Sequence, residues 1–222
     1  IPEHVLIEIE SKRSVNGRII VAGDINQSIY DNATSSDLIR TRIGIPNNGV
    51  EYPLNRIYRL SRRIRTISAD FCQDKQTFLA AQVMDLNPNV PVTLVKANSS
   101  SEEINWLWKS SKEYADAGYA PAIIISNHEE IINFISSLLV IENKPPLQSE
   151  WINTKEKDYY SINRHLATNG IKLQYLGNKY GSFEKAHSQN LVTIITYHSS
   201  KGLDWKAVFI PFLKSEYVIF GD

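Results

Sequence analysis

The sequence predicts an α/β fold in which helices cover both faces of a parallel β-sheet. Apolar segments of strand length alternate along the chain with longer segments that have the helical period of roughly 3.6 residues. Most of the strand segments are apolar at nearly every position, which is typical of strands that are buried on both faces. The length of 222 residues is enough for one large domain, or for one domain and part of another.

The predicted strands are short, apolar and rich in β-branched residues. The first ends at a Gly-Asp pair, and most of the others are followed by polar residues. In chain order they cover residues 18–22, 54–58, 92–95, 122–125, 171–176, 192–196 and 207–210.

Three predicted helices lie between these strands, at residues 61–71, 100–114 and 127–139. The second opens with Ser100 and has Glu103 three residues later, and the third has Asn127 followed by Glu130, which are the spacings of N-terminal capping boxes. The polar stretches 149–158 and 177–190 are predicted loops, and residues 45–49 give the best domain boundary.

Composition restricts the environment and the partners of the chain. Its net charge is zero, so binding to nucleic acid requires a local basic patch. Cys72 is the only cysteine and cannot form an internal disulfide, which favours a reducing compartment. No apolar run is long enough to span a membrane, and no signal peptide is indicated. We therefore expect a cytoplasmic protein without a membrane partner.

The Gly-Asp turn after the first predicted strand leads into polar side chains. Gln27 and Tyr30 supply an amide and a phenol. Ligands of open parallel sheets bind at the carboxyl ends of strands, so the position suits a binding site. The structural alternative is an ordinary turn, in which Asp24 and Asn26 bond only to the local backbone.

Arginines cluster where the second predicted strand runs into a helix. Tyr58 and Arg59 are followed closely by Arg62 and Arg63. The planar guanidinium of an arginine can stabilise the charge that spreads over phosphoryl oxygens during phosphoryl transfer. The structural alternative is a helix whose arginines are only solvated.

A third polar segment follows the strand at 192–196. It contains Thr196, His198, Lys201, Gly202 and Asp204 in close succession. The structural alternative for the histidine is a side chain satisfied within the turn. The other histidines have no metal-ligand spacing, so we predict no metal site in the chain.

Together these segments resemble motifs III, IV and V of superfamily 1 DNA helicases of the UvrD/Rep type. The first matches Gly-Asp-x-x-Gln-Ser-Ile-Tyr at every defined position. The second matches its motif at Leu54, Tyr58, Arg59 and Ile64. The third is similar to Thr-x-His-x-x-Lys-Gly-Leu-Glu-Phe/Trp.

The sequence departs from the family at four of these positions. Asn32 stands where the family usually has a second base-stacking aromatic residue, a tryptophan. Ile57 and Leu60 replace an asparagine and a serine of motif IV. Asp204 replaces the glutamate of motif V and is shorter by one methylene group.

The resemblance implies a RecA-like parallel sheet of the P-loop NTPase helicase core. Residues 1–45 would be the C-terminal edge of the first RecA-like domain, and residues 46–222 the second, truncated before motif VI. The implied function is that of the C-terminal part of an ATP-dependent DNA helicase or translocase, which couples ATP hydrolysis to movement on single-stranded DNA. The family also implies roles in DNA repair and, usually, 3′-to-5′ polarity.

The resemblance also implies a role for each matched residue. Gln27 would sense the γ-phosphate and Arg59 would reach it, so these two are the predicted catalytic residues. Tyr58 would pack on the adenine, and Gly202 and Asp204 would meet the triphosphate and the ribose. DNA contacts would come from Tyr30, Thr196 and His198.

The sequence contains no Gly-x-x-x-x-Gly-Lys-Ser/Thr P-loop and no Asp-Glu pair before the first motif. We therefore expect ATP and Mg²⁺ to be held mainly by residues outside this chain, on an N-terminal RecA-like domain that carries the P-loop. The isolated chain is expected to be inactive. The other expected partner is single-stranded or partly duplex DNA.

Two other functions remain open at this point. The chain can be a degenerate helicase-like module that binds DNA or protein without hydrolysis, or a nucleotide-dependent scaffold in a repair nuclease complex. A P-loop and an Asp-Glu pair upstream in the same reading frame would favour the motor, and their absence would favour the module.

Overall fold

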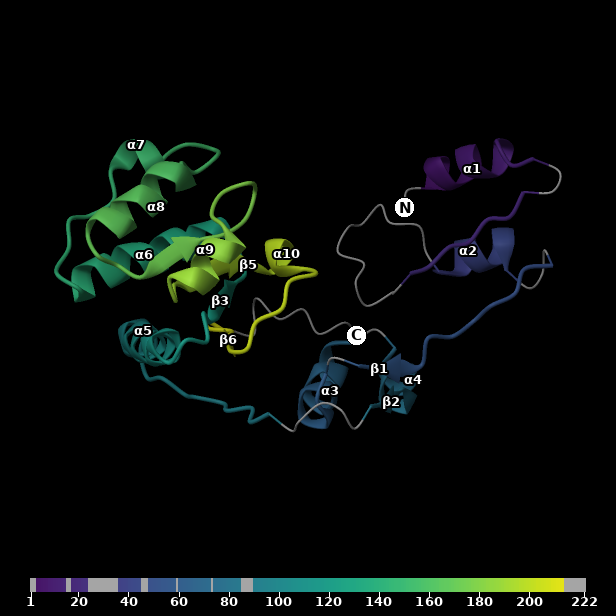
Figure 1. Ribbon diagram of the computed structural model, residues 1–222, viewed down its shortest axis with the longest axis horizontal. Helices are drawn as coiled ribbons and strands as arrows, with labels where there is room; N and C mark the ends of the chain where they lie inside the picture. The colour runs from purple at the N-terminus through teal and green to yellow at the C-terminus, as the bar shows by residue number, and fades with distance from the viewer. Residues whose placement is uncertain are drawn as a thin grey trace. The chain divides into compact units, whose positions relative to one another are not determined.

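The computed structural model describes residues 3–14, 17–23, 36–44, 48–58, 60–72, 74–84 and 90–213 (Figure 1). Their contacts form two compact units. Among the described residues, unit 1 ends at Leu94 and unit 2 begins at Val95.

Unit 1 is built from short elements. In chain order they are α1 (Glu3–Ser11), α2 (Ser36–Ile43), β1 (Arg56–Ile57), α3 (Arg62–Ser68), the 3-10 helix η3 (Ala69–Phe71), α4 (Lys75–Ala80) and β2 (Gln82–Val83). The two strands pair in parallel. Arg42 of α2 forms an ion pair with Glu10 of α1 at 3.1 Å. Arg65 of α3 donates a hydrogen bond of 2.6 Å to the carbonyl of Ala81, directly before β2.

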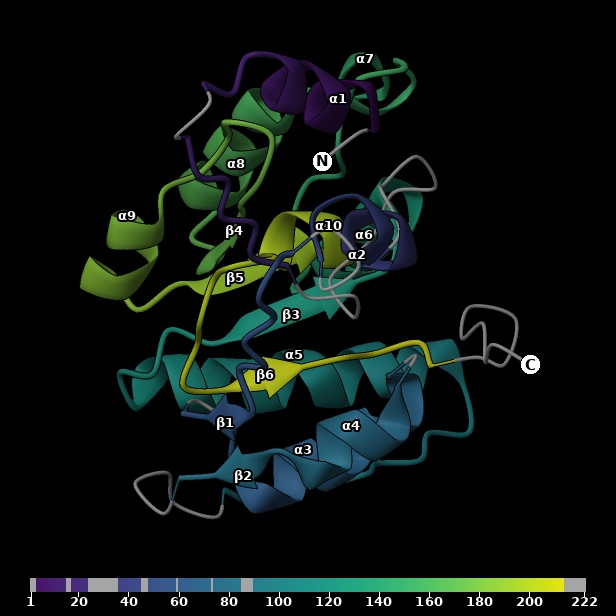
Figure 2. The same ribbon diagram turned by 90° about the vertical axis from the view of Figure 1, so that its right-hand side faces the viewer.

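Unit 2 contains a four-stranded parallel sheet. Its elements are α5 (Ser100–Asp116), β3 (Ala122–Ile125), α6 (His128–Ile141), α7 (Ser149–Ile152), α8 (Tyr159–Thr168), β4 (Leu173–Tyr175), α9 (Phe183–Ser188), β5 (Val192–Thr196), α10 (Tyr197–Ser200) and β6 (Val208–Phe209). The strand order is β4-β5-β3-β6, and every neighbouring pair is parallel (Figure 2).

The core of unit 2 lies around the two central strands. β5 is buried at all five positions, and β3 at three of four. The helices α5 and α6 pack on each other and on β5, and α8 packs on β4. The main cluster of buried apolar side chains runs from Ile104 to Ile194 and includes Phe134, Ile135 and Tyr175. The predicted α/β fold with a parallel sheet is therefore confirmed.

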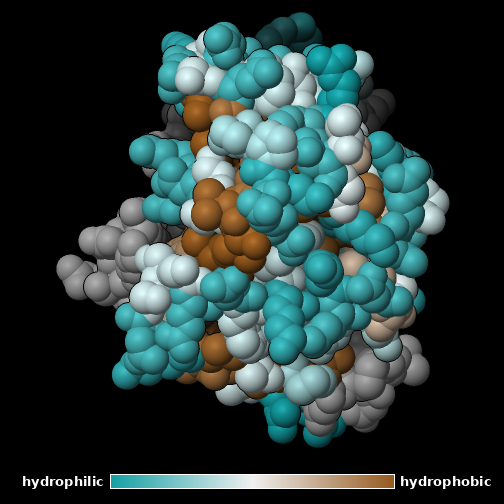
Figure 3. Space-filling view, turned by 90° about the vertical axis from the view of Figure 1, so that its left-hand side faces the viewer, coloured by the Kyte–Doolittle hydropathy of each residue, from teal (hydrophilic) through white to brown (hydrophobic). Residues whose placement is uncertain are grey.

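The surface of this unit carries no single dominant apolar face in the view of Figure 3. That view looks from the side on which α5 to α8 lie in Figure 1, and hydrophobic residues form separate brown groups among hydrophilic ones. In the described ranges, no helix combines the length and the apolar character that crossing a bilayer requires.

Five of the predicted strands are found. The strands β3 and β5 have the predicted bounds, and β1, β4 and β6 are shorter than the predicted segments 54–58, 171–176 and 207–210 that contain them. The predictions for 18–22 and 92–95 are wrong. Ile20 is 92% exposed and Leu94 is 90% exposed. A short apolar segment becomes a strand only where another strand pairs with it. Among the described residues, neither segment has such a partner.

The cap of α5 is one residue earlier than predicted. Ser99, not Ser100, accepts the hydrogen bond from the backbone N–H of Glu102, at 3.2 Å. The carboxylate of Glu103 instead accepts a bond of 2.7 Å from the backbone N–H of Phe212, far along the chain. The predicted cap of α6 is confirmed, because Asn127 accepts a bond of 2.9 Å from the N–H of Glu130.

Both predicted loops contain a short helix. α7 lies at the start of 149–158, and α9 lies within 177–190. The helix α8 was not predicted, although Asp158 caps it and Tyr159, Ile162 and Leu166 form its buried face.

The predicted domain boundary lies inside unit 1. Residues 45–47 are outside the described residues. On either side of them, Gly49 donates a hydrogen bond of 2.9 Å to the carbonyl of Gly44. Arg40 forms an ion pair of 3.3 Å with Glu51. The division found in the contacts lies at Leu94 instead, and the assignment of 1–45 and 46–222 to two RecA-like domains stays a prediction.

Candidate functional site

After the two central strands of unit 2, the chain crosses to opposite edges of the sheet. From β3 the chain continues to β4, which lies beyond β5, and from β5 it continues to β6, which lies beyond β3. Ligands of open parallel α/β sheets bind at such a reversal, at the carboxyl ends of the strands. The residues that leave the sheet there are 126–128 after β3 and 197–200 after β5.

Thr196 closes β5 and caps the one-turn helix α10. Its hydroxyl oxygen accepts a hydrogen bond of 3.2 Å from the N–H of Ser199. The same hydroxyl donates to the Ser199 side-chain oxygen at 3.1 Å. The residue is 4% exposed. The position of Thr196 therefore fixes the turn that follows, and its predicted contact with DNA stays a prediction.

The rest of this turn faces solvent. His198, Lys201 and Asp204 are exposed, and Trp205 packs against Phe183 of α9 with ring centroids 5.8 Å apart. Gly202 has a φ of +84°, a conformation that L side chains rarely adopt. The backbone alone thus explains a glycine at this position. The turn presents an imidazole and an ammonium beside the end of a rigid, buried strand.

A second loop touches this turn from β4. A side chain at Gly177 would place its Cβ 2.9 Å from the side-chain oxygen of Ser199 and 2.8 Å from the hydroxyl of Tyr175. Both distances are too short for a real contact, so only glycine allows the two loops to approach in this way. The loop after β4 therefore supports the turn that carries His198.

The Tyr175 side chain lies under both loops and is fully buried. Its hydroxyl has no hydrogen-bond partner of good geometry among the described residues. Burial raises the pKa of Tyr175 to about 12, and the neighbouring Ser199 hydroxyl partly opposes that rise. The phenol therefore stays neutral and acts in packing.

His128 joins this cluster from the start of α6. One of its ring nitrogens, Nδ1, lies 2.8 Å from the hydroxyl of Tyr159. Tyr159 stacks on Tyr175, with ring centroids 3.5 Å apart and planes 15° apart. Burial, and to a smaller extent the charge of Lys157, lower the pKa of His128. The sequence analysis missed this cluster, although His128 stands where the chain leaves a buried apolar strand.

The other predicted site residues lie in unit 1 or outside the described residues. Tyr58 directly follows β1 and is 56% exposed. Gln27, Tyr30 and Arg59 are outside the described residues. The predicted site residues that lie in unit 2 are therefore Thr196, His198, Gly202 and Asp204, which belong to one continuous segment of the chain.

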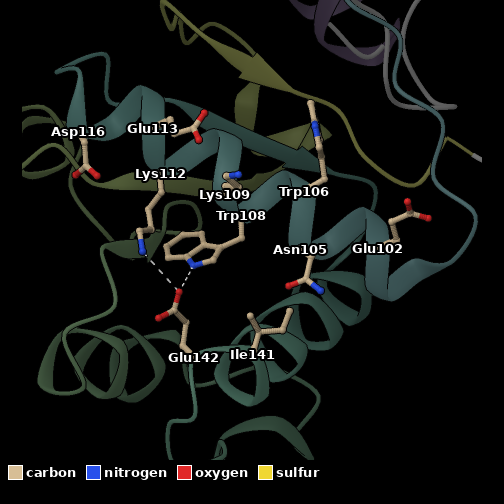
Figure 4. Close-up of a pocket in the computed structure, with 10 residues that line it drawn as sticks. All are labelled: Glu102, Asn105, Trp106, Trp108, Lys109, Lys112, Glu113, Asp116, Ile141 and Glu142. Atoms are coloured by element: carbon tan, nitrogen blue, oxygen red, sulfur yellow. Dashed lines mark hydrogen bonds and ion pairs between the residues drawn. The ribbon is translucent and has the colours of Figure 1, made fainter.

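A groove of about 630 Å³ runs along α5, beside the end of α6 (Figure 4). The indole N–H of Trp108 donates to the carboxylate of Glu142 at 2.6 Å. Lys112 forms an ion pair with the same oxygen at 3.7 Å. Four carboxylates and two lysines line the groove, and Glu142 at the end of α6 is bonded to both Trp108 and Lys112 of α5, so we interpret the groove as the place where these two helices pack.

In comparisons with known proteins, no family model, no curated protein and no solved structure matches this chain. In the described part of the chain, no group of three or more His, Cys, Asp or Glu side chains is placed to hold a metal ion.

Proposed function

We propose that the chain is the C-terminal part of an ATP-dependent DNA helicase or translocase, and that unit 2 is a RecA-like domain. The nucleotide would be held mainly by an N-terminal RecA-like domain with a P-loop and Mg²⁺ ligands. Single-stranded DNA would contact this chain through His198 and Tyr30. Gln27, Arg59 and Gly202 would respond to the phosphate state.

The observation that carries this proposal is the position of the third motif. Its strand portion is β5, a central strand that is buried at every position. Its polar portion leaves the sheet at the reversal between β3 and β5, where ligands of such sheets bind. Thr196 fixes the turn through two hydrogen bonds to Ser199, while His198 and Lys201 remain exposed. An exposed ammonium group at this end of the sheet is suited to contact with a phosphate backbone.

A binding module without hydrolysis is the second candidate. The observation in its favour is that the sequence contains no P-loop, so the chain has no backbone cradle for a triphosphate. The two candidates differ in whether an arginine of this chain contributes to phosphoryl transfer.

Arg59→Ala tests the motor in a polypeptide that joins this chain to its P-loop domain. An arginine that stabilises the transferring phosphoryl group contributes at least about 10³ in kcat. We expect DNA-stimulated ATP hydrolysis to fall by about that factor, while affinity for single-stranded DNA in the absence of nucleotide stays the same. Steady-state ATPase assays and DNA titrations measure the two effects.

Arg63→Ala is the matched control, because Arg63 is an exposed arginine of the following helix. It should leave kcat unchanged. DNA-stimulated hydrolysis by this chain alone would contradict the need for a second domain. Equal kcat for Arg59→Ala and the control would remove the catalytic role and favour the binding module.

A further inference from the structure

A second groove, of about 530 Å³, follows the outer edge of β4. β4 is an edge strand of the four-stranded sheet, because it pairs only with β5 among the described strands. The helix α8 forms one wall of the groove, and the loop after β4 together with α9 forms the other. None of the three motifs contributes a residue to it.

The charges that line this groove are all positive. They come from Arg164, Lys172, Lys179 and Lys185, and no aspartate or glutamate lies among the lining residues. All four side chains are exposed. Of these four cations, only Lys172 has an ion pair with another described residue, Asp116, at 3.0 Å. In a chain whose net charge is zero, this concentration of positive charge is the kind of local patch that nucleic-acid binding requires.

Lys179 is held in an unfavourable backbone conformation at the rim of the groove. Asn178 and Lys179 have φ values of +49° and +71°. Gly177 and Tyr180 exchange two backbone hydrogen bonds, of 3.0 and 2.8 Å, around them. Such a turn favours glycine at its third residue. A lysine at this position costs stability, and a strained residue of this kind is often associated with a functional contact.

Aromatic rings accompany the cations. Tyr160 is 67% exposed, and the guanidinium carbon of Arg164 lies 5.7 Å from the centre of its ring. Tyr180 lies on the opposite wall, and its ring leans on Tyr159, with centroids 6.0 Å apart. Exposed aromatic rings next to cations are the surfaces on which unpaired bases stack.

The edge of β4 is closed to an added peptide strand at Tyr175. The Asn163 side chain accepts a hydrogen bond of 2.7 Å from the backbone N–H of Tyr175 and donates one of 3.0 Å to its carbonyl. The Gln174 side chain donates a bond of 2.7 Å to the carbonyl of Ser182. An added strand would need the backbone groups of Tyr175, so the groove is built for contacts through its side chains.

We propose that this groove binds the sugar-phosphate backbone of a single-stranded nucleic acid, with Lys179, Lys185 and Arg164 on the phosphates and Tyr160 against a base. The proposal deepens the proposed function and rests on it for the class of partner. It adds a contact surface at residues outside the three motifs. Single strands are favoured over duplexes because an exposed tyrosine can stack only on an unpaired base.

The test is the binding of a fluorescently labelled oligothymidine to the full chain, measured by anisotropy at 50 and 200 mM salt. Each lost phosphate contact makes the slope of log affinity against log salt shallower by about 0.7 for a single strand. The double variant Lys179→Gln/Lys185→Gln should therefore reduce the salt-induced change in affinity by about sevenfold. Tyr160→Ala should weaken binding about fivefold or more.

The control is Lys109→Gln/Lys144→Gln, which removes two exposed lysines outside the groove. It should bind as the parent does. Equal binding by the groove variant and this control overturns the proposal. Equal binding of duplex and single strand, with Tyr160→Ala unaffected, overturns the assignment to single strands.

His198→Ala separates this proposal from the proposed function. If His198→Ala weakens binding and the groove variants do not, the groove proposal fails and the proposed function stands. If the groove variants weaken binding and His198→Ala does not, the groove is supported and the motif V contact fails. Urea unfolding, monitored by tryptophan fluorescence, verifies that unit 2 is folded in each variant, because all four tryptophans lie in that unit.

Discussion

His128 is a residue of unit 2 whose ionisation should affect stability in mildly acidic solution. Its ring lies between the hydroxyl of Tyr159, at 2.8 Å, and the ring of Tyr175, with centroids 5.9 Å apart. Burial comes first and the charge of Lys157 second among the causes that lower its pKa below the reference value of 6.5. In the unfolded chain these causes vanish, so the unfolded state takes up a proton at a higher pH than the folded state.

We predict that unit 2 loses stability as the pH falls through 6.5. The stabilising contribution of neutral His128 is complete above that pH. It declines below it until His128 is protonated in the folded state as well. Urea unfolding by tryptophan fluorescence between pH 5 and 8 measures the loss, and NMR titration of the ring should give a midpoint below 6.5.

The variant His128→Gln should remove this component of the pH dependence. His4→Gln is the control, because His4 lies in α1 of unit 1, which contains no tryptophan. A midpoint above 6.5 for His128 would show that its neighbours favour the charged ring, against the burial argued above.

At the scale of elements, the start of α5 offers a comparison between adjacent serines. Ser99 accepts the hydrogen bond from the N–H of Glu102, and Ser100 is the first residue of the helix. Removing a capping side chain costs about 1 kcal/mol. We predict that Ser99→Ala lowers the free energy of unfolding of unit 2 by about that amount. Ser100→Ala should change it by less than about 0.5 kcal/mol.

Urea unfolding of the two variants under identical conditions decides between them. The opposite order of effects would return the cap to Ser100, where the sequence pattern places it. The pattern was ambiguous because a serine with a glutamate three residues later occurs twice in succession, at Ser99 with Glu102 and at Ser100 with Glu103. The structure distinguishes them, because Ser99 accepts the bond from the N–H of Glu102 while Glu103 contacts the N–H of Phe212 instead.

The elements that the sequence predicts well are those whose signals are local. β3 and β5 are continuous apolar runs with β-branched residues, and the structure places both at the predicted bounds. The segment at 92–95 has the same local character, but no strand of the described ranges pairs with it, because strand pairing depends on distant residues. The helix α8 had a readable signal, a capping aspartate followed by apolar residues at helical spacing.

The candidate site divides in the same way. The turn at Thr196 to Asp204 is one continuous segment, so a motif can identify it. The cluster of His128, Tyr159 and Tyr175 comes from two helices and a strand, and the basic groove combines α8, β4 and α9. No local pattern connects those segments, so both become visible only in the folded chain.

At the scale of the whole molecule, the main cluster of buried apolar residues belongs to unit 2. The main cluster of buried apolar residues begins at Ile104 and ends at Ile194, and the whole four-stranded sheet lies after Val95. The connecting residues 91–97 have no regular secondary structure. A segment with its own hydrophobic core can in principle fold alone.

We predict that a polypeptide of residues 95–222 folds without unit 1. It contains the complete sheet and all four tryptophans, so its urea transition by fluorescence should have the same midpoint and slope as that of the full chain. The slope matters because it scales with the surface exposed on unfolding. A lower midpoint would mean that unit 1 stabilises unit 2, and a shallower slope would mean that the shortened chain loses part of its fold. If both values match, the groove variants and His198→Ala can be measured on unit 2 alone, where binding cannot arise from unit 1.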